Sequence, residues 1–180
     1  MPVKLNLIGG LGNPGPSYQN TYHNLGFLTV DELAKRAVVQ SHAAGWRNPK
    51  TPQFEYLKSD RLIFVKNKTS MNESGRAVKT ALEYFRVKPE NAVIVHDDSD
   101  IELGQYKFSF GRGAAGHRGV QSGIDFLKTK NFWRARIGLR KPRSKKKAGE
   151  MVLSKVSRAD SKIFQKTLME VSKTLLKQNG

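Results

Sequence analysis

A tight loop joins the first apolar strand of the chain to its first helix, and it restricts the fold more than any other stretch. The loop lies within residues 10–27, GLGNPGPSYQNTYHNLGF, and is rich in glycine, asparagine and proline. Such a short, restrained connection holds the side chains that it carries in fixed positions. One of them is His23. Taken alone, the stretch leaves open whether His23 is held for chemistry or for packing.

Apolar strands alternate with amphipathic helices along most of the chain. Periodicity predicts strands at 3–8, 54–57, 62–65, 92–95, 105–110 and 133–139, and helices beginning near 24, 71, 119 and 159. This order is typical of the α/β class, here an α/β/α sandwich around a mixed, largely parallel twisted sheet with an antiparallel pair at 54–65. No linker or repeat interrupts the pattern, so we expect a single domain over residues 1–180.

Charge and cysteine content narrow the function classes. The net charge of +17 favours a polyanionic partner, nucleic acid or an anionic surface, over a merely soluble basic protein. Cysteine is absent from the sequence, which excludes disulfides, thiol nucleophiles and thiolate metal sites. Apolar runs are shorter than a membrane span and the N-terminal residues enter a strand at once. We therefore expect a cytoplasmic protein that does not bind membranes.

The densest positive segment lies at 140–147, and other cations are expected around a glycine-rich loop at 111–119. A solvated flexible loop is the alternative reading, but the excess charge favours phosphate binding. The cations concerned are Arg140, Lys141, Arg143, Lys145, Lys146 and Lys147, together with Lys107, Arg112, Arg118, Arg134 and Arg136.

Two glycine patterns match the dinucleotide-binding fingerprint, at 10–15 and at 111–116. In the first, Asn13 and Pro14 stand where a phosphate-binding helix would begin, and the helix starts only near Asn24. The second lies deep in the chain without an early mononucleotide fold before it. We therefore expect these glycines to serve tight turns and close backbone contacts rather than a cofactor.

Polar residues follow several of the predicted strands. Asp97 closes the apolar strand at 92–95, Asn13 follows the first strand, and Asn72 lies near the start of the next helix. In parallel α/β sheets such residues gather at one edge. Together with His23 they supply a general base, a carboxylate that orients it, and neutral hydrogen-bond donors.

The acidic run that contains Asp97 also suits a Mg²⁺ or Ca²⁺ site in its residue types. However, His96, Asp97, Asp98 and Asp100 lack the ligand spacing of a calcium loop. Turn chemistry with one functional aspartate is favoured, and we expect neither a metal nor a cofactor. Serine nucleophile, phosphate-loop and zinc-protease motifs are missing from the sequence, so water is the expected attacking group of any hydrolase.

Five motifs, spread over nearly the whole chain, resemble the bacterial-type peptidyl-tRNA hydrolase family. They are GLGNPGPSYQNTYHNLGF, KNKTSMNESGRAV, VIVHDDSDIELG, GRGAAGHRGV and RARIGLRKP, in the family's order. The resemblance implies an α/β/α domain that hydrolyses the ester between a peptide and the terminal ribose of its tRNA, without a cofactor. It also implies a role in translation and ribosome rescue, and we expect a monomer whose partner is peptidyl-tRNA.

The resemblance also implies roles for individual residues. His23 would activate water and Asp97 would fix its tautomer, while Asn13 and Asn72 would position the peptide and the ester. The other residues that we expect to bind substrate are Tyr18, Met71 and Arg118. Lys107 and Arg136 match positions that meet tRNA phosphate, and the basic loop adds Arg140, Lys141 and Lys145.

Three departures from the family pattern stand out. Arg118 replaces an asparagine that holds substrate or water, and arginine donates hydrogen bonds but cannot accept them. Tyr22 replaces the usual arginine before the catalytic histidine, and Asn67 replaces a common proline. His23 and Asp97 are both present, so hydrolysis is expected. The alternative is a non-catalytic RNA-binding protein on the same fold.

Overall fold

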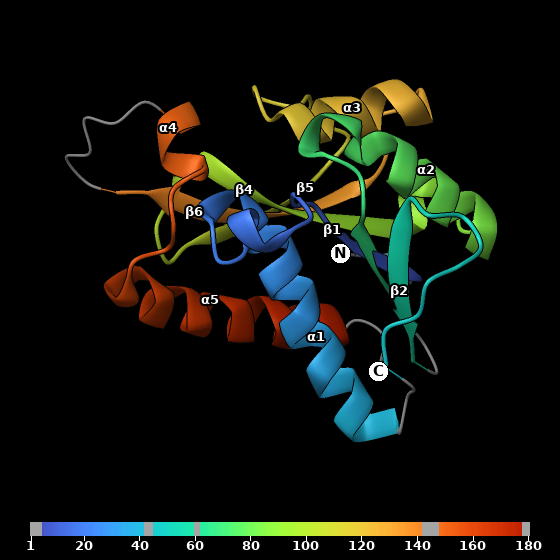
Figure 1. The fold of residues 1–180 in the computed structure, drawn as a ribbon, viewed down its shortest axis with the longest axis horizontal. Helices are drawn as coiled ribbons and strands as arrows, with labels where there is room; N and C mark the ends of the chain where they lie inside the picture. Colours follow the sequence, from blue (N-terminus) through green and yellow to red (C-terminus); the bar gives the residue numbers. More distant parts are fainter. Residues whose placement is uncertain (1–4, 42–44, 60–61, 142–147, 178–180) are drawn as a thin grey trace.

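The computed structural model describes residues 5–41, 45–59, 62–141 and 148–177 (Figure 1). In these residues the strands form a six-stranded sheet in the order β2-β3-β1-β4-β6-β5. The strands are β1 (Leu7–Gly10), β2 (Phe54–Lys58), β3 (Ile63–Asn67), β4 (Ala92–Glu102), β5 (Tyr106–Phe110) and β6 (Trp133–Arg140).

The four central strands run parallel and the two outer strands run against them. β1 pairs in parallel with β3 and β4, and β4 pairs in parallel with β6. β2 and β5 form antiparallel pairs with β3 and β6. The predicted mixed, largely parallel sheet is therefore confirmed.

Helices cover both faces of the sheet, as Figure 1 shows. α1 (Leu25–Ser41) and α5 (Arg158–Lys177) pack on one face, and α2 (Ser74–Phe85) and α3 (Arg118–Leu127) pack on the other. The described residues also form α4 (Ala148–Val152) and the 3-10 turns η1 (Pro16–Tyr18), η2 (Tyr22–Asn24), η3 (Met71–Glu73) and η4 (Pro89–Asn91). Within the described part of the chain, none of the helices combines the length and the apolar character that crossing a bilayer requires.

The apolar start of β4 explains its central place in the sheet. Val93 and Val95 pack into the core under α1 and α5, while Ile94 packs into the core under α2 and α3. A strand buried on both faces has no polar alternation, which is why this segment reads as a continuous apolar run.

Two glycines bring the first helix down onto the sheet. A Cβ added to Gly10 would lie 2.4 Å from the carbonyl oxygen of Gly26, and one added to Gly26 would lie 2.4 Å from the carbonyl oxygens of Leu11 and Val95. Real Cβ atoms do not come so close to backbone, so α1 can start over the end of β1 and over Val95 of β4 only with glycine at both places. The turn η2, which carries His23, is thereby held beside β4.

Several predicted boundaries were wrong. The strand predicted at 92–95 continues to Glu102, so Asp97 lies within β4 rather than at its end. Polar residues prolong the strand because β4 keeps pairing with β6 through Asp98 and, after a register shift, at Glu102. The first strand is Leu7–Gly10 rather than 3–8, and α4 was not predicted because a single helical turn has no periodic pattern.

Candidate active site

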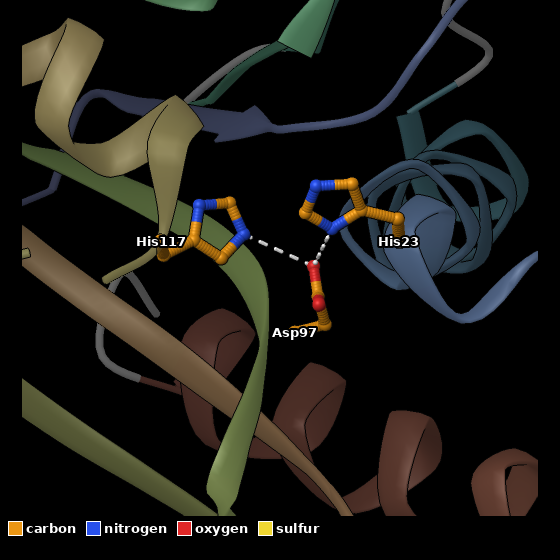
Figure 2. Close-up of side chains that lie close together, drawn as sticks. All are labelled: His23, Asp97 and His117. Carbon is orange, nitrogen blue, oxygen red and sulfur yellow. Dashed lines mark hydrogen bonds and ion pairs between the residues drawn. The ribbon is translucent and has the colours of Figure 1, made fainter. Parts of the chain in front are cut away.

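Two histidines meet at one carboxylate oxygen (Figure 2). His23 of η2 places Nδ1 2.8 Å from Oδ1 of Asp97 on β4. His117, at the start of α3, places Nε2 3.0 Å from the same oxygen. The Asp97 side chain is only 3% exposed, against 14% for His23. The cluster joins the strand, the first loop and the glycine-rich loop at one point.

The helix cap formed by His117 fixes which ring nitrogens carry protons. Nδ1 of His117 accepts a hydrogen bond from the backbone N–H of Val120 at 3.2 Å, so this nitrogen is unprotonated. In the neutral ring the proton is therefore on Nε2, which donates it to Asp97. His23 donates from Nδ1 to the same carboxylate, and this leaves Nε2 of His23 with a free lone pair. In Figure 2 that nitrogen points away from Asp97.

Asp97 is ionised although it is buried. Burial by itself raises the pKa of a carboxyl group, but the hydrogen bonds from His117 and His23 outweigh it here and hold the pKa of Asp97 well below its usual range. A carboxylate in this state accepts both histidine protons and fixes both rings.

A third histidine backs the cluster. The ring of His96 lies edge-on to that of His117 at 4.6 Å, and Nδ1 of His96 is 2.7 Å from the carbonyl oxygen of Asp97. Burial holds the pKa of His96 well below its usual range, and the nearby His117 lowers it further. His96 is therefore a neutral packing partner of His117.

A pocket of about 230 Å³ opens beside the cluster. Arg118, the first residue of α3, is exposed on its wall, and α4 adds Gly149 and Val152. The predicted residues His23, Asp97 and Arg118 are thus brought together in one pocket. Its complete lining is His23, Asp97, Asp98, Ser99, Ala115, Gly116, His117, Arg118, Gly149 and Val152.

Asn13 is held on both its backbone and its side chain. Its backbone N–H donates to Oδ1 of Asn24 at 2.8 Å, and its carbonyl accepts from Nδ2 of Asn24 at 2.9 Å. Its side-chain Oδ1 accepts from the backbone N–H of Met71 at 2.8 Å. This bond fixes the orientation of the side-chain amide, and its Nδ2 group supplies donors that can serve a ligand.

Asn67 clamps the residue before Asn13. Its Oδ1 accepts from the Gly12 N–H at 3.2 Å, and its Nδ2 donates to the carbonyls of Gly12 and Thr69 at 2.8 and 2.7 Å. The proline that the resemblance leads us to expect at this position could form none of these bonds. Asn13, Asn24 and Asn67 also line a second pocket of about 470 Å³.

The remaining predicted substrate residues, Tyr18, Met71 and Asn72, line neither pocket. Met71 is buried in η3, and Asn72 follows it with an exposed side chain. The bond from the Met71 N–H to the side chain of Asn13 therefore ties the residue before Asn72 to the first loop. Tyr18 is 39% exposed in η1 and is not among the residues that line either pocket.

The predicted phosphate-binding cations fall into several environments. Lys107 is exposed and faces Arg136 in register across β5 and β6. Three further predicted cations form ion pairs: Arg136 Nε with Asp98 Oδ2 at 2.7 Å, Arg140 with Glu102 at 3.1 Å, and Lys141 with Asp160. Lys145 lies outside the described residues, as do Arg143, Lys146 and Lys147.

Arg134 was wrongly grouped with the cationic surface. Its side chain is only 2% exposed, and burial lowers its pKa. It lies two residues before Arg136 on β6, so both side chains point to the same face of the sheet, and Arg134 is the more deeply covered of the two.

The acidic run at 96–100 does not converge as a metal site would. Asp98 is engaged by Arg136 and accepts a hydrogen bond from the Asp100 N–H at 2.9 Å. Among the described residues, one group of possible metal ligands lies within 4.8 Å of one another: His23, Asp97 and His117. The two hydrogen bonds to Asp97 already account for that proximity.

Three residues of the site were not predicted from the sequence: His117, Asn24 and Asn67. A signal existed for His117, which stands directly before a helix where a side chain caps the first turn. Asn24 was predicted only as a helix cap, and its bonds across the loop to Asn13 depend on the folded turn.

Comparison with known proteins points to one family. Its model, described as Peptidyl-tRNA hydrolase, matches residues 7–178. The Aquifex aeolicus peptidyl-tRNA hydrolase is 34% identical over 97% of this chain and 90% of its own, and that of Aliarcobacter butzleri is 41% identical over 86% and 81%. A crystal structure of peptidyl-tRNA hydrolase from Acinetobacter baumannii has a TM-score of 0.86 at 26% identity, covering 98% of this chain and 89% of that one. The chain belongs to the peptidyl-tRNA hydrolase family.

Proposed function

We propose that this protein hydrolyses the ester bond between peptide and tRNA in peptidyl-tRNA, with water activated by His23. The observation that carries the proposal is the bond from His23 Nδ1 to Asp97, at 2.8 Å, which leaves Nε2 free as a base. Family membership over residues 7–178 supplies the substrate class. Every step uses groups of this chain and water, with no cofactor.

The reaction proceeds in two steps. Nε2 of His23 takes a proton from water as the water oxygen attacks the ester carbonyl carbon, and Asp97 stabilises the resulting imidazolium. The tetrahedral intermediate then loses the ribose oxygen, which takes the proton back from His23. The products are a free peptide and a tRNA with its terminal hydroxyl restored.

Asn13 and Asn72 position the substrate in this proposal. The Nδ2 group of Asn13 points its donors at the peptide because its Oδ1 is bound to the Met71 N–H. Asn72 follows Met71 and donates to the developing oxyanion. Met71 and Tyr18 contact the peptide chain, and Arg118 donates to substrate carbonyls at the pocket wall, where it is exposed.

The comparisons give no support to the alternative of a non-catalytic RNA-binding protein. The relatives compared above carry the hydrolase name, and the His23–Asp97 pair has no purpose in binding alone. Binding of the tRNA part is assigned to Lys107, Arg136 and Arg140, and to Lys145. The whole chain acts as one domain and as a cytoplasmic monomer in this proposal.

Replacing the proposed base tests the reaction directly. His23→Ala removes the proton acceptor and should lower kcat for peptide release by roughly 100-fold or more, while the Kd for tRNA stays unchanged. Single-turnover cleavage of peptidyl-tRNA and a tRNA-binding titration measure the two quantities. Equal release rates for the wild type and the variant would refute the mechanism.

The depressed pKa of Asp97 predicts a pH-dependent contribution to stability. A carboxyl group whose pKa in the folded protein lies below its unfolded value of about 3.8 stabilises the folded protein above that pH. This stabilisation is lost as the pH falls. The difference in unfolding free energy between the wild type and Asp97→Asn should therefore shrink between about pH 5 and pH 2.5, by up to about 1.4 kcal/mol per pH unit. Urea unfolding measures it, and a difference independent of pH contradicts the account.

Lys107 offers a test of the tRNA surface. Lys107→Met should weaken tRNA binding and reduce the log–log salt slope by about 0.7 to 0.9, the share of one phosphate contact. The matched control is Lys166→Met, an exposed lysine on α5 at the opposite face of the sheet. If both variants change the slope equally, Lys107 contributes only general charge.

A further inference from the structure

The residue before His23 is tied to the C-terminal part of the chain by a cluster of polar and charged side chains, of which Lys141 is partly exposed. The hydroxyl of Tyr22 donates to Oδ2 of Asp160, and Nζ of Lys141 forms an ion pair with the same oxygen. Tyr22 and Asp160 are 3% and 6% exposed, so both polar groups are removed from water. Lys141 also lies 5.5 Å above the Tyr22 ring, a cation–π contact. We refer to Tyr22, Lys141 and Asp160 as the brace.

Asp160 is well placed to stay charged. It lies in the first turn of α5, where the helix dipole favours an anion, and its N–H donates to Oγ of Ser157 at 3.1 Å. Burial would raise its pKa, but the bonds from Lys141 and Tyr22 outweigh this and lower it. The Tyr22 ring packs edge-on to Phe164 of the same helix at 5.9 Å. α5 thus holds both the ring and the hydroxyl of Tyr22.

Backbone contacts extend the same connection. The segment between α4 and α5 runs beside the residues that lead to His23. The Tyr22 N–H donates to the Ser154 carbonyl at 3.2 Å, and the Val156 N–H donates to the Asn20 carbonyl at 2.8 Å. Lys155 Nζ donates to the Ser17 carbonyl at 2.9 Å. The first loop is therefore fixed at several points to the segment between α4 and α5.

His23 sits between two held neighbours. η2 is a single turn, Tyr22–Asn24, in which Asn24 is bound to Asn13 and Tyr22 is bound to Asp160. The position of the His23 ring opposite Asp97 depends on both anchors, because one turn of backbone has little freedom between them. Displacement of a catalytic group by a fraction of an ångström slows a reaction without weakening binding.

We propose that Asp160 and Tyr22 are positioning residues for His23, and that Lys141 serves as the counter-ion of Asp160 rather than as a ligand of tRNA phosphate. This rests on the proposed function of His23 as the base. A phosphate that drew Lys141 away would leave the buried Asp160 carboxylate without its cation, which is strongly unfavourable. Tyr22, one of the departures from the family pattern, is thereby given a role that suits this chain.

The experiment compares Tyr22→Phe, Lys141→Met and Lys141→Arg with the wild type and with Lys166→Met as the charge-matched control. Tyr22→Phe keeps the ring and removes only the hydroxyl. We expect Tyr22→Phe and Lys141→Met to lower kcat by about threefold to tenfold, with KM and the salt slope of tRNA binding unchanged. Lys141→Arg should retain wild-type kcat. The double variant Tyr22→Phe/Lys141→Met should lose no more kcat than the more damaging of the two single variants, because both substitutions act through Asp160.

Other outcomes overturn the inference. If Lys141→Met raises KM and reduces the salt slope by about 0.7 to 0.9 with kcat unchanged, Lys141 binds phosphate. If Tyr22→Phe and Lys141→Met keep wild-type kcat, the brace is only packing. Thermal unfolding checks that each variant is folded. If Lys141→Met does not fold, the kcat of Tyr22→Phe alone tests the inference. A wild type that fails to release peptide refutes the proposed function itself, so the two failures are distinguished.

Discussion

One oxygen atom, Oδ1 of Asp97, accepts a hydrogen bond from each of two histidines, and the geometry of the site depends on it. His117 arrives there because it caps α3, and His23 because two glycines seat α1 directly on the sheet. Both bonds keep the buried carboxylate ionised. The same bonds turn the unoccupied nitrogen of His23 outward. Fold and chemistry are therefore linked at a single acceptor.

The fold could be predicted from the sequence because strand and helix periods are strong local signals. The meeting of His23 and Asp97 was also predictable, since polar residues after parallel strands gather at one edge. The length of β4 was not, because Asp97 and Asp98 look like the end of a strand until their partners on β6 and α3 are known. His117 was not predicted because its bond to Asp97 joins residues that lie 20 positions apart in the sequence.

The net charge is a weaker guide to the tRNA-binding surface than the position of each cation in the folded chain. The net charge of +17 predicts a polyanionic partner, but Arg136, Arg140 and Lys141 each face an acidic residue in the folded chain. Arg134 is buried altogether. A basic segment in a sequence does not separate cations that meet a ligand from cations that hold the fold. Asn67 and Tyr22, two departures from the expected family pattern, both form buried hydrogen bonds that the sequence does not reveal.

The protonation of the histidine rings tests the central claim most directly. Nitrogen-15 NMR of the imidazole groups in the folded wild type at neutral pH distinguishes the tautomers of His23 and His117. The account predicts a proton on Nδ1 of His23 with Nε2 free, and the opposite tautomer for His117. In Asp97→Ala only the His23 assignment is lost, because Nδ1 of His117 still accepts from the Val120 N–H. A His23 ring protonated on Nε2 alone, with Nδ1 bare beside Asp97, would contradict it.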